Sequence, residues 1–334
     1  MLITITGAYK NAGDHLIGLR AKALLEKFFD GEVVNIDRKQ PIDYEFLNTA
    51  KAVVLTGGPA LQPGIYPGVY DLDLEKINVP VIGFGLGWKA SLGKKPAEFE
   101  FSQSSLVFLE KLKASMFSVR DQQSFELLES LGFQKLSMTG CPAWYDLEKI
   151  DYEFTLPSSI NHVVLSTPAV PNKQLLKIAK LISKKYPKAK KTLMFQAGFE
   201  STHSKKSSEY TKQLKRVSLR LKLSGWEIVS TESDPKKMME VLGSADLHIG
   251  YRVHSHLFML SQRKLSVLIA EDARGESQNT TLGLQNLTRD SSIEEINEYV
   301  SLIVDDPKSL QPTIKLMQES FEDMKQFLKK LKAL

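Results

Sequence analysis

The sequence has almost no cysteine: Cys141 is the single one among 334 residues. One thiol excludes an internal disulfide and any metal cage built from cysteines, which fits a reducing compartment. We interpret Cys141 as a small buried hydrophobic residue. Long apolar runs are missing as well, since no stretch reaches the roughly 18 apolar residues that a membrane-spanning helix needs. These absences predict a globular, soluble protein.

A signal peptide and the marks of a nucleic-acid-binding protein are also absent. The N-terminal segment MLITITGAYK lacks a basic head, an apolar stretch and a cleavage site, so a cytoplasmic location is expected. Basic clusters carry much of the net charge of +5, but no nucleic-acid-binding module and no basic stripe interleaved with aromatic residues is found, which argues against nucleic acid as a partner. Such clusters usually form a solvated face, but they are also compatible with an anionic substrate or with peripheral contact with the inner membrane surface. The clusters occupy residues 184–191, 205–206, 212–222 and 325–332.

Apolar residues alternate or run continuously in five short segments of the N-terminal half, and these predict strands. The segments are 2–6, 33–36, 52–55, 79–83 and 115–118. Apolar residues at helical spacing predict helices at 14–29, 101–113 and 121–131. In the first of these helices, the residues expected to face inward are Leu16, Leu19, Ala23 and Leu24.

Segment 146–157 has little periodicity, so we place a domain junction there. Strands are predicted again at 162–166, 192–196, 226–229, 245–249 and 267–270. Helices are predicted at 172–185, 207–223, 234–243, 255–262, 277–284 and 292–303. Because strands that alternate with helices build parallel sheets, the predicted fold class is α/β, with two Rossmann-like domains whose parallel sheets face across a cleft.

Glycine-rich segments follow three of the predicted strands. In GAYKNAGD, Asn11 and backbone amides could reach a ligand, and Asp14 is suited to cap the following helix. Gly57 and Gly58 follow the strand at 52–55, and Gly83-Phe84-Gly85-Leu86-Gly87 is expected to form a turn. That turn lacks the third glycine of a dinucleotide-binding fingerprint, and no phosphate-binding loop of the GxxxxGK[ST] type occurs. We interpret these glycines as allowing close backbone approach beneath a cleft.

The most informative segment is ADLHIGYRVHSHLFML, residues 245–260. A short strand is expected to end at Gly250 and a helix to begin near Ser255, which places Arg252 and His254 in the turn between them. Ligands collect at such carboxyl ends of parallel strands, and the N–H groups of the following helix favour an anion. Arg120 stands at an equivalent place before a helix capped by Asp121 and closed by Gly132.

Structural interpretations of the same side chains remain open at this stage. Arg252 could simply pair with Asp246, and a histidine in such a turn could serve only as a helix-end hydrogen-bonding residue. Arg120 could be a surface residue that bridges to Asp121 or Glu126. His248 alternates with apolar neighbours and is expected to be structural, whereas His256 could fall on either face of its helix.

Five segments in the same order resemble those of the polysaccharide pyruvyl transferase family, and the resemblance covers nearly the whole chain. GAYKNAGDHLI is similar to the family's opening G-x-x-x-N-x-G-D segment, VVLTGGPALQ to its second glycine-rich motif and GFGLG to its third. SVRDQQSFELLESLG resembles the S-x-R-D-x-x-S segment, and ADLHIGYRVHSHLFML resembles the R-x-H element after a short strand.

The resemblance implies the two-Rossmann arrangement called GT-B and transfer of a pyruvyl group from phosphoenolpyruvate to a sugar, giving a ketal. The acceptor would belong to a cell-surface polymer or its polyprenyl-linked precursor. Domain 1–150 would form the acceptor side and contribute Arg120, and domain 151–305 would form the donor side. No cofactor is implied beyond phosphoenolpyruvate as donor substrate, and a divalent metal ion is left undecided.

Carried onto this sequence, the family's donor-binding and catalytic positions fall on Arg120, Arg252 and His254. Arginine forks would hold the phosphate and carboxylate of the donor, and His254 would act as acid or base. Two positions depart from the family pattern. Cys141 replaces an acidic residue, and Glu271-Asp272-Ala273-Arg274 stands where a lysine is common, which leaves Arg274 as a substitute cation. Asp14, Asn11, Gly57, Gly58 and Gly85 are further substrate-binding candidates.

Three other functions share some of these features. A GT-B glycosyltransferase that uses a nucleotide sugar would have the same fold, with Glu271 and Asp272 near the place where a ribose is recognised. A metal hydrolase could draw ligands from Asp246, His248, His254 and His256, although no HExxH spacing exists. A sugar- or phosphate-binding protein without turnover is the third.

Residues 306–334 are predicted to form an amphipathic helix with a basic end. We expect its apolar side to pack back across the domain cleft, and contact with an anionic membrane is the alternative. The apolar positions are Leu310, Ile314, Met317, Phe321, Met324, Phe327, Leu328 and Leu331.

Overall fold

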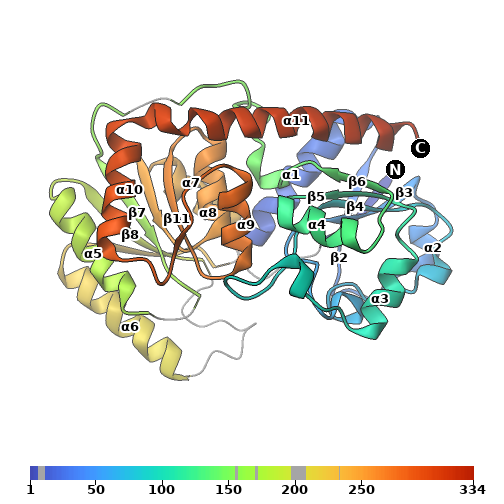
Figure 1. Cartoon of the computed structure of the whole chain (residues 1–334), viewed down its shortest axis with the longest axis horizontal. Coiled ribbons are helices and arrows are strands. Elements are labelled where there is room, and N and C mark those ends of the chain that lie inside the picture. The colour runs from blue at the N-terminus through green and yellow to red at the C-terminus, as the bar shows by residue number, and fades with distance from the viewer. Residues whose placement is uncertain (7–11, 155–156, 170–171, 197–207, 233) are drawn as a thin grey trace.

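The computed structural model describes residues 1–6, 12–154, 157–169, 172–196, 208–232 and 234–334, and for residues 208–211 only the backbone. Within these residues the strands form two sheets of six, and all strand pairs are parallel. Figure 1 shows the first sheet on the right and the second on the left, with the last helix running along the top over both. The predicted α/β fold with two parallel sheets is confirmed.

The first sheet has the strand order β2-β1-β3-β4-β5-β6. The chain places β2 on one side of β1 and the later strands on the other side, so the strand order reverses between β1 and β3. Its central strand β3 is buried along its whole length, because a parallel sheet covered by helices on both faces needs continuous apolar strands. The strands are β1 (Leu2–Thr6), β2 (Val33–Asp37), β3 (Ala52–Thr56), β4 (Val81–Leu86), β5 (Met116–Val119) and β6 (Lys135–Met138).

The second sheet has the order β12-β11-β10-β7-β8-β9, with its reversal between β10 and β7. In open parallel sheets the crevice at such a reversal, at the carboxyl ends of the strands, is where ligands bind. The strands are β7 (His162–Ser166), β8 (Lys190–Phe195), β9 (Glu227–Ser230), β10 (Leu247–Gly250), β11 (Leu265–Ala270) and β12 (Leu287–Thr288).

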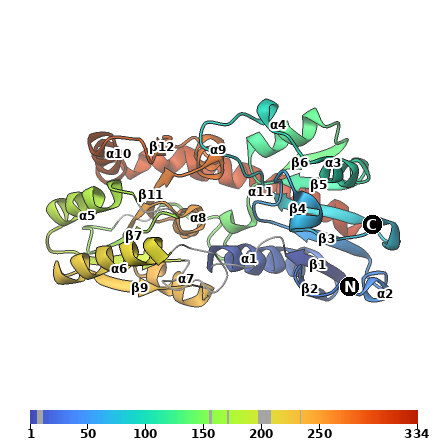
Figure 2. The same ribbon diagram turned by 90° about the horizontal axis from the view of Figure 1, so that it is seen from below.

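Helices cover both sheets, and α1 and α8 lie in the middle of the molecule between them (Figure 2). The α-helices are α1 (Ala12–Phe28), α2 (Tyr44–Leu47), α3 (Gln103–Glu110), α4 (Gln122–Ser130), α5 (Gln174–Lys185), α6 (Ser208–Leu223), α7 (Pro235–Gly243), α8 (Val253–Ser261), α9 (Ala273–Thr281), α10 (Ile293–Asp305) and α11 (Gln311–Lys332). Short turns of other helix types are η1 (Ile65–Val69), η2 (Leu74–Lys76), η3 (Pro96–Glu98), η4 (Pro142–Trp144) and η5 (Pro307–Leu310).

The expected turn at residues 83–87 is wrong, because β4 continues through most of it to Leu86. Glycine serves the strand here rather than a turn. A Cβ on Gly83 would lie 2.4 Å from the ring of Phe117 on β5, so only glycine allows the two strands to pair. Gly85 has a φ of +64°, and the pairing register with β5 shifts between Gly83 and Leu86. Strands β6 and β12 were not predicted; both are short, and β6 is only partly buried.

The apolar positions predicted for the last helix are all buried. Helix α11 packs on α1 and β6, and the ring of Phe327 stacks on Phe84 of β4 with centroids 6.0 Å apart. Its C-terminal end also reaches the first sheet, where Lys51 Nζ donates to the carbonyl of Lys332. The inward position expected for Leu19 is wrong, because this side chain is 47% exposed.

Among the described residues, no helix combines the length and apolar character needed to cross a bilayer.

Candidate active site

One pocket collects the predicted histidine and all three predicted arginines. Its walls come from segments that follow β1 and β5 in the first sheet and β8, β10 and β11 in the second, so strand ends of both sheets meet there. The pocket has a volume of about 40 Å³, little more than one water molecule occupies. The lining residues are Asp14, Arg120, Gln196, Tyr251, Arg252, Val253, His254, Glu271, Asp272 and Arg274.

Arg120 follows β5 and is almost fully buried, with 1% of its surface exposed. Its Nε donates to the carboxylate of Asp121 at 3.2 Å, so the predicted pair with Asp121 exists, but the alternative of a surface arginine is wrong. The guanidinium lies against the backbone of Gly87, where a Cβ would come within 1.9 Å of Nε. A glycine after β4 is therefore what makes room for this buried cation.

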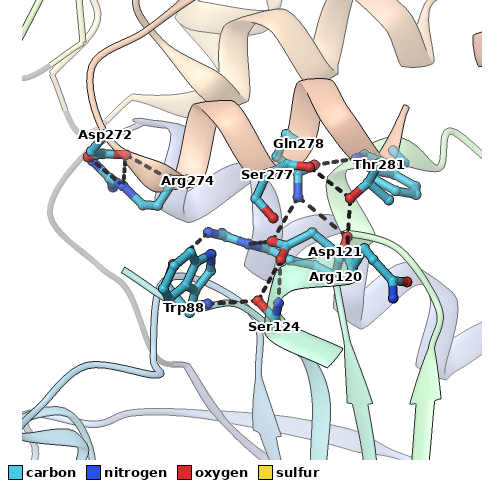
Figure 3. A network of polar contacts seen from close by, with 11 residues as sticks. Trp88, Arg120, Asp121, Ser124, Asp272, Arg274, Ser277, Gln278 and Thr281 are labelled. Carbon is cyan, nitrogen blue, oxygen red and sulfur yellow. Dashed lines mark hydrogen bonds and ion pairs between the residues drawn. The ribbon is translucent and has the colours of Figure 1, made fainter. Parts of the chain in front are cut away.

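Asp121 is the centre of a buried polar network around Arg120 (Figure 3). It caps α4 as predicted, because its carboxylate accepts from the backbone N–H of Ser124 at 2.9 Å. Gln278 of α9 donates to the same carboxylate at 3.2 Å and accepts from the indole of Trp144 at 2.8 Å. Gln278, from the helices around the second sheet, thus helps to fix Arg120, which follows a strand of the first sheet. The sequence analysis missed this contact because no local pattern links the two segments.

Arg252 is the residue that caps the N-terminal end of α8. Its backbone N–H donates to Ser166 Oγ at the end of β7, and its Nη2 donates to the carbonyl of Pro168 at 3.2 Å. Within the described part of the chain its Nε is buried without a hydrogen-bond partner. The considered pair with Asp246 does not form, because that carboxylate accepts from the backbone N–H groups of Asn161 and His162.

His254 lies inside the first turn of α8 rather than in the preceding turn as predicted, because helical backbone begins at Val253. Its side chain is 8% exposed, and its Nε2 has no hydrogen-bond partner among the described residues. Burial, together with the positive charges of Arg120 and Arg274, lowers the pKa of His254 to about 3. The imidazole is therefore neutral near pH 7.

The segment after β11 adds two acidic side chains and the third arginine. Arg274 binds Asp272 with Nε and Nη2, at 2.9 Å and 2.6 Å from the same carboxylate oxygen. Burial alone would raise the pKa of Asp272, but the charge and hydrogen bonds of Arg274 outweigh burial and lower it. Both oxygens of Glu271 accept from the backbone N–H of Ala169, at 2.9 Å and 2.8 Å. Because Arg274 pairs with Asp272, the positive charge of Arg274 is largely neutralised.

The N-terminal candidates have different positions. Asp14 lines the pocket, but it lies in the first turn of α1, which begins at Ala12, and so does not cap the helix as predicted. Asn11 lies outside the described residues.

The three glycine candidates are not among the residues that line this pocket. A Cβ on Gly57 would meet Ile17 of α1 at 2.2 Å, and one on Gly85 would meet Pro142 at 2.5 Å. The backbone of Gly58 accepts from the N–H of Gly87, which lies beneath Arg120. These glycines allow close packing beneath the site, as the sequence indicates for glycine-rich segments.

The remaining histidines of the segment have structural partners. His248 hydrogen-bonds Ser266 and Ser166, as its expected structural role requires, and His256 turns inward to the same Ser266 Oγ at 2.9 Å. Burial lowers the pKa of both imidazoles to about 3. No group of His, Cys, Asp or Glu that could hold a metal ion occurs in the described part of the chain.

Cys141 is fully buried in the core, as predicted for a small hydrophobic residue. Burial raises the pKa of its thiol to about 11, so the thiol stays protonated and is a poor nucleophile.

Sequence reasoning missed three residues that shape the pocket. Gln196 and Tyr251 line it. Gln196 is the last residue of the predicted strand at 192–196 and Tyr251 comes shortly after the one at 245–249, so their place at strand ends was a usable signal. Gly13 lies in the first turn of α1, where a Cβ would come within 2.7 Å of His254. No local pattern shows that contact, since the two residues are far apart in the chain.

Comparisons with known proteins relate this chain to one sequence family and to one type of fold. The sequence model of the polysaccharide pyruvyl transferase family matches residues 11–272. No curated protein matches the chain significantly.

Solved structures resemble the chain at low sequence identity. The UDP-GlcNAc 2-epimerase from Neisseria meningitidis bound to UDP-GlcNAc has a TM-score of 0.56 and 12% identity, over 98% of this chain and 99% of its own. MnaA from S. aureus in complex with UDP has a TM-score of 0.52 and 10% identity, over 96% of this chain and 91% of its own. The lipopolysaccharide outer core galactosyltransferase WaaB, in its apo form, has a TM-score of 0.53 and 8% identity, over 100% of both chains. At these identities the likenesses show the fold alone, which is of the GT-B type.

Proposed function

The chain belongs to the polysaccharide pyruvyl transferase family, and on that premise we propose that it transfers a pyruvyl group from phosphoenolpyruvate to two hydroxyls of one sugar, forming a ketal. The acceptor we propose is a sugar of a cell-surface polysaccharide or of its lipid-linked precursor. The observation that carries the proposal is the convergence of Arg120, Arg252 and Arg274 around His254 in one pocket.

The guanidinium groups of the pocket suit a small donor with two anionic groups, although the carboxylates of Asp14, Glu271 and Asp272 line the same pocket. Phosphoenolpyruvate carries a phosphate and a carboxylate close together, and a guanidinium fork binds either one with two parallel hydrogen bonds. Arg120 and Arg274 each have a carboxylate partner, whereas the hydrogen bond from the Arg252 guanidinium within the described residues goes to a neutral carbonyl. Arg252 also stands at the N-terminal end of α8, where free backbone N–H groups attract anions. We therefore assign it the leading part in holding the donor.

The proposed reaction needs no further reactant. The first sugar hydroxyl loses its proton and forms a bond to C2 of the donor, while C3 gains a proton and becomes a methyl group. The second hydroxyl then bonds to C2 and loses its proton, and the C–O bond to phosphate breaks. Inorganic phosphate leaves with the electron pair, and the sugar retains a cyclic ketal of pyruvate.

His254 is the proposed proton carrier. It is neutral before the donor arrives, so its first task is to accept a proton. A bound dianion would favour the charged imidazolium and raise the pKa, because opposite charges stabilise each other in a buried site. A protonated His254 could then deliver its proton to C3 or to the leaving phosphate. Donor binding must also widen the pocket, whose volume is about 40 Å³.

The test is release of inorganic phosphate from phosphoenolpyruvate, measured against a panel of hexosides and hexosamine glycosides. We expect release that depends on the acceptor, with one ketal formed per phosphate by mass spectrometry. Phosphoenolpyruvate should also raise the melting temperature through binding to the native state. Stabilisation by a uridine or cytidine nucleotide sugar, with no effect of phosphoenolpyruvate, would instead support nucleotide-sugar-dependent glycosyl transfer.

A further inference from the structure

A second and larger pocket adjoins the arginine pocket. Its volume is about 720 Å³. That value lies within the range of about 300–1,000 Å³ that is usual for sites that bind small molecules. Glu271 and Asp272 line both pockets and so form a common wall. The other lining residues are Gln62, Pro63, Lys89, Ala90, Ser91, Leu92, Lys94, Glu98, Phe99, Glu100 and Arg289.

Both sheets build this pocket, and hydrogen bonds join the two sides. The first sheet supplies the segment between β4 and α3, and the second supplies the segments that follow β11 and β12. The N–H of Gly93 donates to the carboxylate of Glu276 at 2.7 Å, and the N–H of Ala273 donates to the carbonyl of Ala90 at 3.2 Å. The segment from Lys89 to Glu100 is thereby anchored to the N-terminal part of α9, beside the common wall.

An aromatic ring in this wall is held in a fixed orientation. Phe99 packs edge-on against Trp88, with ring centroids 5.7 Å apart and an interplanar angle of 72°. It also packs against Phe101, at 5.0 Å and 82°. Trp88 in turn is fully buried in an apolar cluster of the first sheet and its helices. A ring fixed in this way can offer an apolar surface to a ligand at a low cost in conformational entropy.

The larger pocket combines side chains of both charges, with one more carboxylate than basic group. Four carboxylates and three basic side chains line it, and Lys94 pairs with Glu98 at 3.8 Å. A balanced set of donors and acceptors around an apolar face suits a neutral ligand with many hydroxyls rather than a polyanion.

We propose that the larger pocket binds the acceptor as a neutral glycoside, with one sugar ring on Phe99 and its reacting hydroxyl directed at Glu271. This inference rests on the proposed function and adds the class of acceptor and its place. Glu271 stands on the wall towards the arginine pocket, and its two hydrogen bonds from Ala169 fix the carboxylate. The carboxylate accepts a hydrogen bond from the acceptor hydroxyl and orients it towards the donor.

The first experiment measures glycoside binding to the full-length chain by calorimetry without phosphoenolpyruvate, using neutral methyl glycosides and disaccharides. Phe99→Ala should weaken binding about tenfold or more, because the stacking surface is lost, and Phe99→Trp should retain it. Phe46→Ala is the control, since this partly exposed phenylalanine of α2 is not among the lining residues. The melting temperature of each variant shows whether it folds.

The second experiment uses steady-state kinetics with Glu271→Gln. We expect the acceptor KM to rise and kcat to fall, because the hydrogen bond that orients the acceptor hydroxyl is weakened. Unchanged acceptor affinity in folded Phe99→Ala, or no glycoside binding by the wild type, overturns the acceptor site. If phosphoenolpyruvate neither stabilises the protein nor releases phosphate while Phe99-dependent glycoside binding persists, the proposed function fails and the sugar site stands.

Discussion

At the scale of single residues, the three arginines of the pocket differ in what surrounds them. Arg120 and Arg274 have carboxylate partners at 3.2 Å and 2.6 Å, which offset much of their charge. Within the described residues, Arg252 has a neutral carbonyl partner for Nη2 and a buried Nε without one. An orphaned buried donor costs free energy unless a ligand satisfies it. We therefore expect Arg252 to be the arginine most sensitive to substitution in the proposed donor binding.

We predict that Arg252→Lys weakens phosphoenolpyruvate binding by about tenfold or more although the positive charge is kept, because an ammonium cannot form the two parallel bonds of a guanidinium. Isothermal titration calorimetry measures the effect. Arg216→Lys on the exposed side of α6 is the matched control and should bind like the wild type. Wild-type affinity in Arg252→Lys would remove the guanidinium fork from the mechanism.

We predict that His254→Ala lowers turnover by about 100-fold or more while donor affinity stays within a few-fold, since proton transfer is lost and the arginines remain. Single-turnover kinetics together with calorimetry separate the two effects. His256→Ala should lower turnover far less, because His256 turns to Ser266 in the core. Equal small losses in both variants, or an effect confined to KM, would mean that the imidazole only helps to bind substrate.

Buried imidazoles are expected to make stability depend on pH, and three of them have strongly lowered pKa values. The pKa values of His248, His254 and His256 are about 3 in the folded chain, below the ordinary value near 6.5. Between these values the unfolded chain binds more protons, so stability is fully present above pH 6.5 and is lost as the pH falls towards 3. Each histidine contributes a slope of roughly 1 kcal/mol per pH unit in that window.

Urea unfolding at pH 7.0, 6.0 and 5.0 tests this dependence. We expect the free energy of unfolding to fall at each step, with a shallower fall in His256→Gln, which lacks one buried imidazole. Carboxylates change the free energy of unfolding mainly below pH 5.0, because their ordinary pKa values lie near 4. A stability that is constant from pH 7.0 to 5.0 would show that these histidines are accessible to protons in the folded protein.

At the scale of elements, the contact between α1 and α8 positions the imidazole of His254. The first turn of α1 comes from the first sheet's layer and lies against the first turn of α8, so Gly13 faces His254. A Cβ at Gly13 would lie 2.7 Å from both Cβ and Nδ1 of His254, which is too close for either to stay in place. Glycine at this position therefore sets the orientation of the imidazole.

We predict that Gly13→Ala lowers turnover by about tenfold or more, because a displacement of the reacting group by about 1 Å is costly in catalysis. Gly18→Ala in the same helix is the control, since its Cβ would meet only Thr6 Cγ2 at 3.9 Å. That control should stabilise the protein by about 0.5–1 kcal/mol through helix propensity and leave kcat unchanged. Equal kcat values in the two variants would contradict the positioning role of Gly13.

At the scale of the whole molecule, α11 is part of the core rather than an appendage. Its buried side chains belong to one apolar cluster that includes Leu2 and Ile82 from the first sheet and Val164 and Met194 from the second. An element at the end of the chain thus covers residues that come from both halves of the sequence (Figure 1). The same burial leaves the apolar side of α11 unavailable to a membrane.

We predict that truncation after Pro307 abolishes cooperative unfolding. Each large apolar side chain contributes about 1.5–3 kcal/mol on burial. The eight predicted apolar positions are all buried, so their loss is comparable to or larger than the roughly 5–15 kcal/mol by which a typical protein is stable. Circular dichroism during thermal unfolding gives the result. An unchanged melting temperature combined with lost liposome binding would assign this helix to the membrane instead.

The sequence alone determined most of the order of strands and helices, although β6 and β12 were missed and β4 extends beyond its predicted end. Apolar periodicity depends on neighbours a few positions apart, so β7 and the cap at Asp121 could be predicted from local spacing. Arg120, Arg252 and His254 were singled out because the sequence predicts each of them between a strand and a helix, where parallel sheets bind ligands. The structure places His254 inside the first turn of α8. The apolar side of the helix predicted within residues 306–334 was likewise found from local spacing.

Only the tertiary structure decided what these residues become together. Gly83 lies within a strand beside Phe117 of β5, and Gly85 of the same strand packs against Pro142. Contacts of this kind have no local signature. The pKa of His254 falls because burial and two arginines from different sheets act on one imidazole. Spacing along the chain fixes periodicity, whereas distance, burial and charge between remote segments arise only when the two sheets pack. The physical state of the site is therefore a property of the assembled fold.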